Sequence, residues 1–506
     1  MLFVDRTAAG DDSGLTSDAV TNPFDRQAAC PSCGAPITFR FAGAAAQVCR
    51  SCNFVVARTD RNLVAVGRMA DLVDIPSPLT LGATGRWNNT EPFVVDGRVQ
   101  LDRASAPGAP WQEFFITFPN SGKWCWVATA QGRWYSTSEF PIPPPGLPAI
   151  HSLRPGQQIQ LGEYGVWTVA EVGQRRVVAG EGEMPAVAQP GLPTGFVDIA
   201  GPNGAFGTLD YGDGRNIPQK LYLGRQIDPA IMALDSGTQV QAAEAKVTSV
   251  TCPNCGGNLP LVTPGQTERV VCRYCGMASD LAAGALKALG PAPKPPIEPY
   301  IPLGTEGTLR NNRVICIGFT IRGCTVEGER YRWREYLLYA GPRIGYLWLM
   351  EEDGVWWLVT PIPPGEVAVS GGSALYQTKY YNWKQSVRAE TEYVIGEFYW
   401  KVEIGESVQA TEYEGQGAKV SVEQNNKEVT YSLCERLTPN DIATAFGVKA
   451  PSGGSSSGEG GSGCGTIILI IIIVIIVLIV LGDCDGCGSG GGGGVFIGGP
   501  SFGGGK

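Results

Sequence analysis

Two four-cysteine segments constrain the fold of this chain more than any other feature. The first runs from Cys30 to Cys52 as CPSCGAPITFRFAGAAAQVCRSC, and a similar segment runs from Cys252 to Cys275. Two residues between cysteines let both sulfurs of a turn reach one ion, and four thiolates complete the tetrahedron that zinc prefers. We therefore predict two structural zinc ions, with reduced core cysteines or a redox or iron site as the alternatives. The predicted ligands are Cys30, Cys33, Cys49, Cys52, Cys252, Cys255, Cys272 and Cys275.

The sequence after each cysteine segment repeats as well. WQEFF and WREYL match at an offset of 222 residues, and three tryptophan pairs keep the register: Trp111 and Trp333, Trp126 and Trp348, Trp134 and Trp356. Such self-similarity is typical of a duplicated unit. Each unit contains short aromatic and β-branched segments between Gly and Asn turns, which predict strands of five to seven residues in a small barrel or sandwich. We expect the tryptophans to fill the cores of these domains.

The predicted fold class is mainly β: two zinc ribbons, each followed by a small all-β domain, and one C-terminal transmembrane helix. The clearest other helix is PNDIATAF at 439–446, where we expect Asn440 to be the cap. The expected segments are a disordered lead-in (1–28), ribbon 1 (29–58), β domain 1 (78–235), ribbon 2 (248–280), a Pro-rich linker (281–300), β domain 2 (301–447), a Gly/Ser tether (448–463), the transmembrane helix (464–482) and a Gly-rich disordered tail (483–506).

Net charge and histidine content argue against several classes of function. The formal net charge of the 506 residues is −9, which provides no electrostatic footprint for nucleic acid. We predict no nucleic-acid binding, because the ribbons add few basic residues: Arg40, Arg50, Arg269 and Arg273. His151 is the single histidine, so metal sites that need two histidines are excluded. We expect His151 to lie in a loop. We also expect Cys125, Cys316, Cys324 and Cys434 to be buried thiols.

An apolar run near the C-terminus predicts a membrane span. Residues 467–481 are all Ile, Leu or Val, and the uncharged window 460–482 allows a helix of about 30 Å, the thickness of a hydrocarbon core. The alternative is a buried core strand, but we expect no strand of a soluble domain to run for fifteen residues. Because the start of the chain has no secretory signal pattern, we expect 464–482 to be a tail anchor in the cell membrane, with the bulk of the chain in the cytoplasm. Cys484 and Cys487 could take lipid, form a disulfide or bind metal.

These motifs together resemble a bacterial family known as domain of unknown function 4178. The resemblance rests on CxxC…CxxC, LGxxG, W-x-E-[FY], the aromatic strand, EGEMP at 181–185 and VIGEFYWKVEIGE at 394–406. It covers roughly residues 28–447, in two copies. The resemblance implies a zinc-ribbon β protein that is associated with the cell envelope, in company with stress or polyamine-synthesis-like proteins, and with no defined reaction.

The predicted function is that of a membrane-anchored adaptor or scaffold for a protein partner. One alternative is a sensor that binds a small cationic ligand on its aromatic residues. A second alternative is a cryptic hydrolase or transferase that uses Glu113 and Glu335, which occupy equivalent positions in the two units. We expect these carboxylates to pair with a nearby arginine or to cap a turn, and we predict no enzyme activity and no catalytic residues.

Overall fold

The computed structural model describes residues 27–449, apart from 60–61, 74, 76, 131, 216, 236–247, 264–265, 283–284, 292–296 and 371. The predicted lead-in, Gly/Ser tether, transmembrane helix and Gly-rich tail lie outside the described residues, wholly or almost wholly, and Cys484 and Cys487 do so too. Among the described residues, no helix combines the length and apolar character needed to cross a membrane.

The first half of the chain forms an eight-stranded antiparallel barrel. Its sheet closes because β7 pairs with β12 as well as with β8. In order around the barrel, the strands are β7 (Glu91–Arg103), β8 (Ala106–Phe118), β9 (Lys123–Ala130), β10 (Arg133–Phe140), β15 (Lys220–Ile227), β14 (Ala205–Asp210), β13 (Thr194–Ala200) and β12 (Val166–Met184).

A second eight-stranded barrel has the same pairing order, and β23 closes it against β29. Its strands, in the corresponding order, are β23 (Asn312–Val326), β24 (Glu329–Tyr339), β25 (Tyr346–Glu352), β26 (Val355–Ile362), β32 (Val429–Leu437), β31 (Ala418–Gln424), β30 (Ser407–Gly415) and β29 (Lys379–Phe398). Short strands extend the two sheets: β6 (Thr84–Trp87), β11 (Gln158–Gln160), β16 (Met232–Leu234), β22 (Glu306–Leu309), β27 (Val367–Ser370) and β28 (Ser373–Tyr376).

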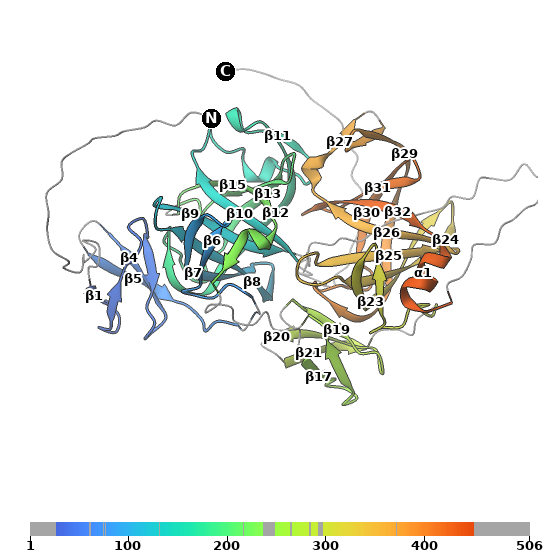
Figure 1. Cartoon of the computed structure of the whole chain (residues 1–506), viewed down its shortest axis with the longest axis horizontal. Coiled ribbons are helices and arrows are strands. Elements are labelled where there is room, and N and C mark those ends of the chain that lie inside the picture. Colours follow the sequence, from blue (N-terminus) through green and yellow to red (C-terminus); the bar gives the residue numbers. More distant parts are fainter. Residues whose placement is uncertain are drawn as a thin grey trace, which may run out of the picture.

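Each cysteine segment is a small ribbon that joins the sheet of its own barrel. Strand β3 pairs with the end of β12, and β19 pairs with the end of β29. Figure 1 shows the first ribbon at the outer edge of the molecule and the second ribbon near the place where the barrels meet. The ribbon strands are β1 (Gln27–Ala29), β2 (Pro36–Thr38), β3 (Ala46–Val48), β4 (Phe54–Arg58), β5 (Leu63–Arg68), β17 (Thr248–Thr251), β18 (Asn258–Leu261), β19 (Arg269–Val271), β20 (Met277–Ala282) and β21 (Ala285–Pro291).

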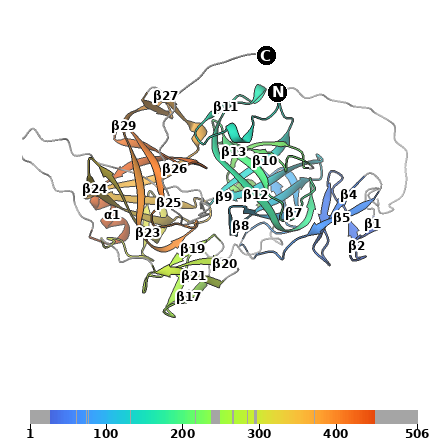
Figure 2. The ribbon, with the colours of Figure 1, turned by 180° about the vertical axis from the view of Figure 1, so that it is seen from behind.

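The two barrels lie side by side, as the view from behind also shows (Figure 2), and the segments in contact are not equivalent in the two barrels. The backbone N–H of Val172 in β12 donates to the carbonyl of Lys427 at 2.7 Å, and Glu171 forms a single β-bridge with Glu428. The side chain of Gln424 donates to the carbonyl of Pro155. These contacts place the end of β31 and the start of β32 against the middle of β12.

The tryptophans occupy three different environments. Trp333 and Trp348 lie inside the second barrel, where residues from seven of its strands form one cluster. Trp356 instead packs outside the barrel, beneath the only α-helix of the described residues, α1 (Pro439–Phe446). Trp111 and Trp126 are half-buried against ribbon 1. The expectation that all of them fill barrel interiors was therefore only partly right.

Several local predictions were wrong. Several strands are longer than five to seven residues, because β-bulges let β12 and β29 bend around the barrels for 19 and 20 residues. Strand length alone therefore does not exclude a strand for a fifteen-residue apolar run. Part of the expected linker, at 285–291, is strand β21. The cap of α1 is Thr438 rather than Asn440: its side chain accepts the N–H of Asp441, whose carboxylate accepts the N–H of Thr438.

Candidate metal centres

The described part of the chain contains two clusters in which four thiols face one another. In the first, Sγ of Cys30 lies 3.8 Å from Sγ of Cys52, and Sγ of Cys33 lies 3.7 Å from Sγ of Cys49. In the second, the pairs Cys252–Cys275 and Cys255–Cys272 are both 3.7 Å apart. All four sulfurs of each cluster lie within 4.8 Å of one another. The predicted ligands are thus brought together as two sets of four.

The sulfur spacing fits a tetrahedral metal ion. A tetrahedron with metal–sulfur bonds of about 2.3 Å has sulfur–sulfur edges of about 3.8 Å. In each cluster, one thiol is poised to lose its proton first. The backbone N–H of Phe54 lowers the pKa of Cys52 to about 7, and the side chain of Asn254 lowers the pKa of Cys275 to about 6. Thiolates are the ligating form, so each cluster could hold one ion.

The four turns that carry the cysteines are built alike. In each, the residue after the second cysteine donates its N–H to the carbonyl of the first, at 2.8 to 3.0 Å. That residue has a positive φ, which Gly and Asn tolerate at low cost. It is Gly34, Asn53, Gly256 or Gly276. The sequence CxxC[GN] therefore encodes the turn that directs both sulfurs to one point.

A glutamate from each barrel holds the ribbon loop between the two cysteine pairs. Glu183 in β12 accepts the backbone N–H groups of Arg40 and Phe41, at 2.5 and 2.9 Å. The equivalent Glu397 in β29 accepts the N–H groups of Val262 and Thr263, both at 2.7 Å. We call Glu183 and Glu397 the docking glutamates. Both glutamates lie in segments that carry the family resemblance, but no role was predicted for them; the available signal was an acid directly after glycine in each segment.

The glycine before each docking glutamate allows the strand to pass close to the barrel wall. Gly182 and Gly396 have φ of +76° and +105°. A Cβ at either position would lie 2.2 to 2.3 Å from a carbonyl oxygen, that of Asp96 or Ile317. The Gly-Glu pair is therefore required by the ribbon–barrel junction.

Glu113 and Glu335 make equivalent contacts with the tryptophan two residues earlier. The indole N–H of Trp111 donates to Glu113 at 3.1 Å, and that of Trp333 donates to Glu335 at 2.7 Å. Arg175 lies 3.5 Å from Glu113, and Arg322 lies 3.8 Å from Glu335.

Glu335 is sealed inside the second barrel, with 1% of its surface exposed. Burial raises its pKa to about 7. A substrate cannot reach this carboxylate in the described conformation, so its protonation is a property of the barrel interior.

The histidine and the remaining described cysteines lie apart from the two thiol clusters. His151 is exposed in a 3-10 turn, Ile150–Ser152. Cys125, Cys316, Cys324 and Cys434 are buried, and burial raises the pKa of each thiol. None of these residues joins a cluster of three or more metal-ligating groups in the part of the chain that the structure describes.

The comparison with protein families found one match. Residues 302–439 match the model of a family described as Domain of unknown function (DUF4178). This range covers most of the second barrel, including the docking glutamate Glu397, and ends at the start of α1. The search of curated proteins found no match, and neither did the search of solved structures.

Proposed function

We propose that this chain is a membrane-tethered scaffold that presents two zinc ribbons to a protein partner. In this proposal both units are copies of the family domain, and zinc is the ion in both thiol clusters. The shared pairing order of the two barrels supports the duplication. Four-thiolate sites without an open position are typical of structural zinc.

The observation that carries the proposal is the shared docking of the two ribbons. Each ribbon is held at its loop by a docking glutamate, while one cysteine of its first pair, Cys33 or Cys255, is exposed. At the second pair of ribbon 2, the side chain of Tyr274 is 64% exposed, with the guanidinium of Arg273 over its ring at 5.8 Å. Tyr and Arg are enriched among the residues that dominate protein interfaces.

Membrane attachment through 464–482 would place the scaffold on the cytoplasmic surface. The segment 452–463, with eleven Gly or Ser residues among its twelve, would act as a flexible tether between α1 and the span.

Crosslinking in fractionated cells tests the proposal. We expect the full-length protein in the membrane fraction, crosslinked to a defined protein that mass spectrometry identifies. Tyr274→Ser, which installs the residue found at the equivalent position of ribbon 1, should reduce recovery of that protein. Tyr380→Ser is the matched control, because Tyr380 is 65% exposed on β29 and lies away from both ribbons.

The other outcomes separate the alternatives. Recovery from membranes without a protein partner would contradict the scaffold and favour the sensor. Recovery in the soluble fraction would contradict the anchor. Equal loss of partner with Tyr274→Ser and Tyr380→Ser would contradict a role for ribbon 2.

A further inference from the structure

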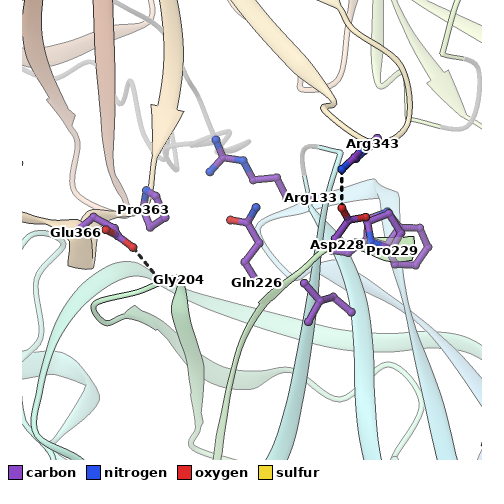
Figure 3. Close-up of a pocket in the computed structure, with 10 residues that line it drawn as sticks. Arg133, Gly204, Gln226, Asp228, Pro229, Arg343, Pro363 and Glu366 are labelled. Atoms are coloured by element: carbon purple, nitrogen blue, oxygen red, sulfur yellow. Dashed lines mark hydrogen bonds and ion pairs between the residues drawn. The ribbon is translucent and has the colours of Figure 1, made fainter. Parts of the chain in front are cut away.

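A cleft with a volume of about 400 Å³ lies between the two barrels. Cross-barrel contacts flank it on two sides (Figure 3). On one side the carboxylate of Glu366 accepts the N–H of Gly204 at 2.8 Å, and on the other Arg343 pairs with Asp228 at 2.9 Å. The cleft has the size of a small-molecule site and lies at a domain junction, where such sites are common.

Arg133 of β10 projects into the cleft between these two contacts (Figure 3). One of its N–H groups donates to the carbonyl of Pro361 in the second barrel. Among the described residues, no carboxylate lies within the 4.0 Å of an ion pair with Arg133. A guanidinium carries five donors and stays charged, so Arg133 offers a positive charge and further donors to the cleft.

The neighbours of Arg133 provide a carboxamide and an apolar wall. Gln226 of β15 lies beside Arg133 in the cleft, with its side chain exposed (Figure 3). Ile227, Pro229 and Pro363 also line the cleft. Polar groups that fix orientation against an apolar surface are the usual composition of a small-molecule site.

We propose that the cleft binds a small organic anion, a carboxylate or a phosphate monoester, whose charged group contacts Arg133 and whose carbon skeleton lies on the apolar wall. The two carboxylates of the cleft are already engaged, because Asp228 pairs with Arg343 and Glu366 binds the amide of Gly204. Of the two arginines that line the cleft, Arg133 is therefore the one without an ion pair among the described residues, and Glu366, which forms no ion pair there either, is held by a backbone amide. The site is independent of the proposed scaffold function.

The charges of the cleft predict that two substitutions weaken anion binding and a third strengthens it. A general loosening of the interface would not strengthen binding. Arg133→Gln removes a charge-assisted hydrogen bond and should weaken binding about tenfold or more. Gln226→Glu adds a negative charge without breaking a cross-barrel bond, and should also weaken binding. Glu366→Gln removes a negative charge but keeps an oxygen that can accept the N–H of Gly204, so binding should become severalfold tighter.

Calorimetric titration of the full-length protein in detergent tests the site. The probes are sodium benzoate, phenyl phosphate and inorganic phosphate. We expect saturable binding of benzoate or phenyl phosphate, and the tighter of the two identifies the head group. Arg225→Gln is the matched control: its side chain donates to the carbonyl of Asn203 on the same barrel, outside the cleft, and the change should leave the affinity within about threefold of the wild type.

Three results would overturn the proposal. The first is no saturable binding of either organic probe below about 10 mM. The second is unchanged affinity in Arg133→Gln, or weakening by Glu366→Gln equal to that of Arg133→Gln. The third is equal affinity for inorganic phosphate and phenyl phosphate, because the apolar wall would then contribute nothing.

Discussion

Removal of the docking glutamate Glu397 should release the loop of ribbon 2 from its barrel. Glu397 is 4% exposed, and its carboxylate accepts two backbone N–H groups and the hydroxyls of Thr263 and Thr267. In Glu397→Ala the hydroxyl of Thr267 keeps an acceptor, the carbonyl of Thr263. The two backbone amides lose theirs. A hydrogen bond to a charged group contributes about 1.5–3 kcal/mol, so two of them give about 3–6 kcal/mol.

Hydrogen exchange and metal release should report this change. The amides of Val262 and Thr263 should lose protection, and a colorimetric chelator should take the metal of ribbon 2 about a hundredfold faster or more, if release requires local detachment. Glu183→Ala should have a smaller effect on ribbon 1. Glu183 also accepts two backbone N–H groups, but Arg40 is exposed, so water can replace the lost acceptor there.

Glu298→Ala is the control, because the Glu298 side chain is exposed outside the ribbons. The docking role would be refuted if Glu397→Ala kept wild-type protection at Val262 and Thr263. It would also be refuted if Glu298→Ala released metal as fast as Glu397→Ala.

Three further predictions concern the metal, the barrel interior and the helix. Chelation under reducing conditions should remove about two metal ions per chain and abolish hydrogen-exchange protection in both ribbons, since metal binding supplies about 10–16 kcal/mol of folding free energy per site; full protection after complete metal removal would contradict a structural role. Burial raises the pKa of Glu335 from 4.5 to about 7, so the folded chain holds a proton that the unfolded chain has lost, and the free energy of unfolding falls as pH rises through this window. Between pH 6 and pH 8, the free energy of unfolding of Glu335→Gln should therefore fall by about 1 kcal/mol less than that of the wild type, in denaturant titrations that follow the second barrel. An equal fall in both proteins would show that Glu335 does not hold the proton. Thr438→Ala should destabilise α1 by about 1 kcal/mol, measured by denaturant unfolding, whereas Asn440→Ala should have almost no effect; the reverse order would restore Asn440 as the cap.

The two four-thiol clusters were predictable from sequence, but the docking contacts were not. CxxC spacing and the following Gly or Asn determine the turn locally, so the eight cysteines of the two clusters could be named without knowing the fold. The bond from Glu397 to Val262 joins residues 135 positions apart, and its existence depends on where β29 ends relative to the ribbon. No local sequence pattern indicates a contact between residues so far apart in the chain.

Strand length failed as a prediction for a related reason. Bulges at Trp383–Gln385 and Val169–Glu171 let one strand continue around the barrel wall, while the sequence shows only a change in apolar periodicity there. The helix cap was misassigned because Thr438 and Asn440 are both capping residues. Which of them caps depends on where β32 ends, at Leu437, directly before Thr438.

The contact between the two barrels is asymmetric. Asp228 of the first unit meets Arg343 of the second, whereas the equivalent positions serve local bonds: Thr438 caps α1, and the N–H of Ser121 closes its own turn on Phe118. The units are therefore joined head to tail, and a contact between unlike faces does not close on itself. This contact therefore leaves a different face uncovered on each barrel. A partner that recognises the uncovered face of one barrel would have no equivalent site on the other.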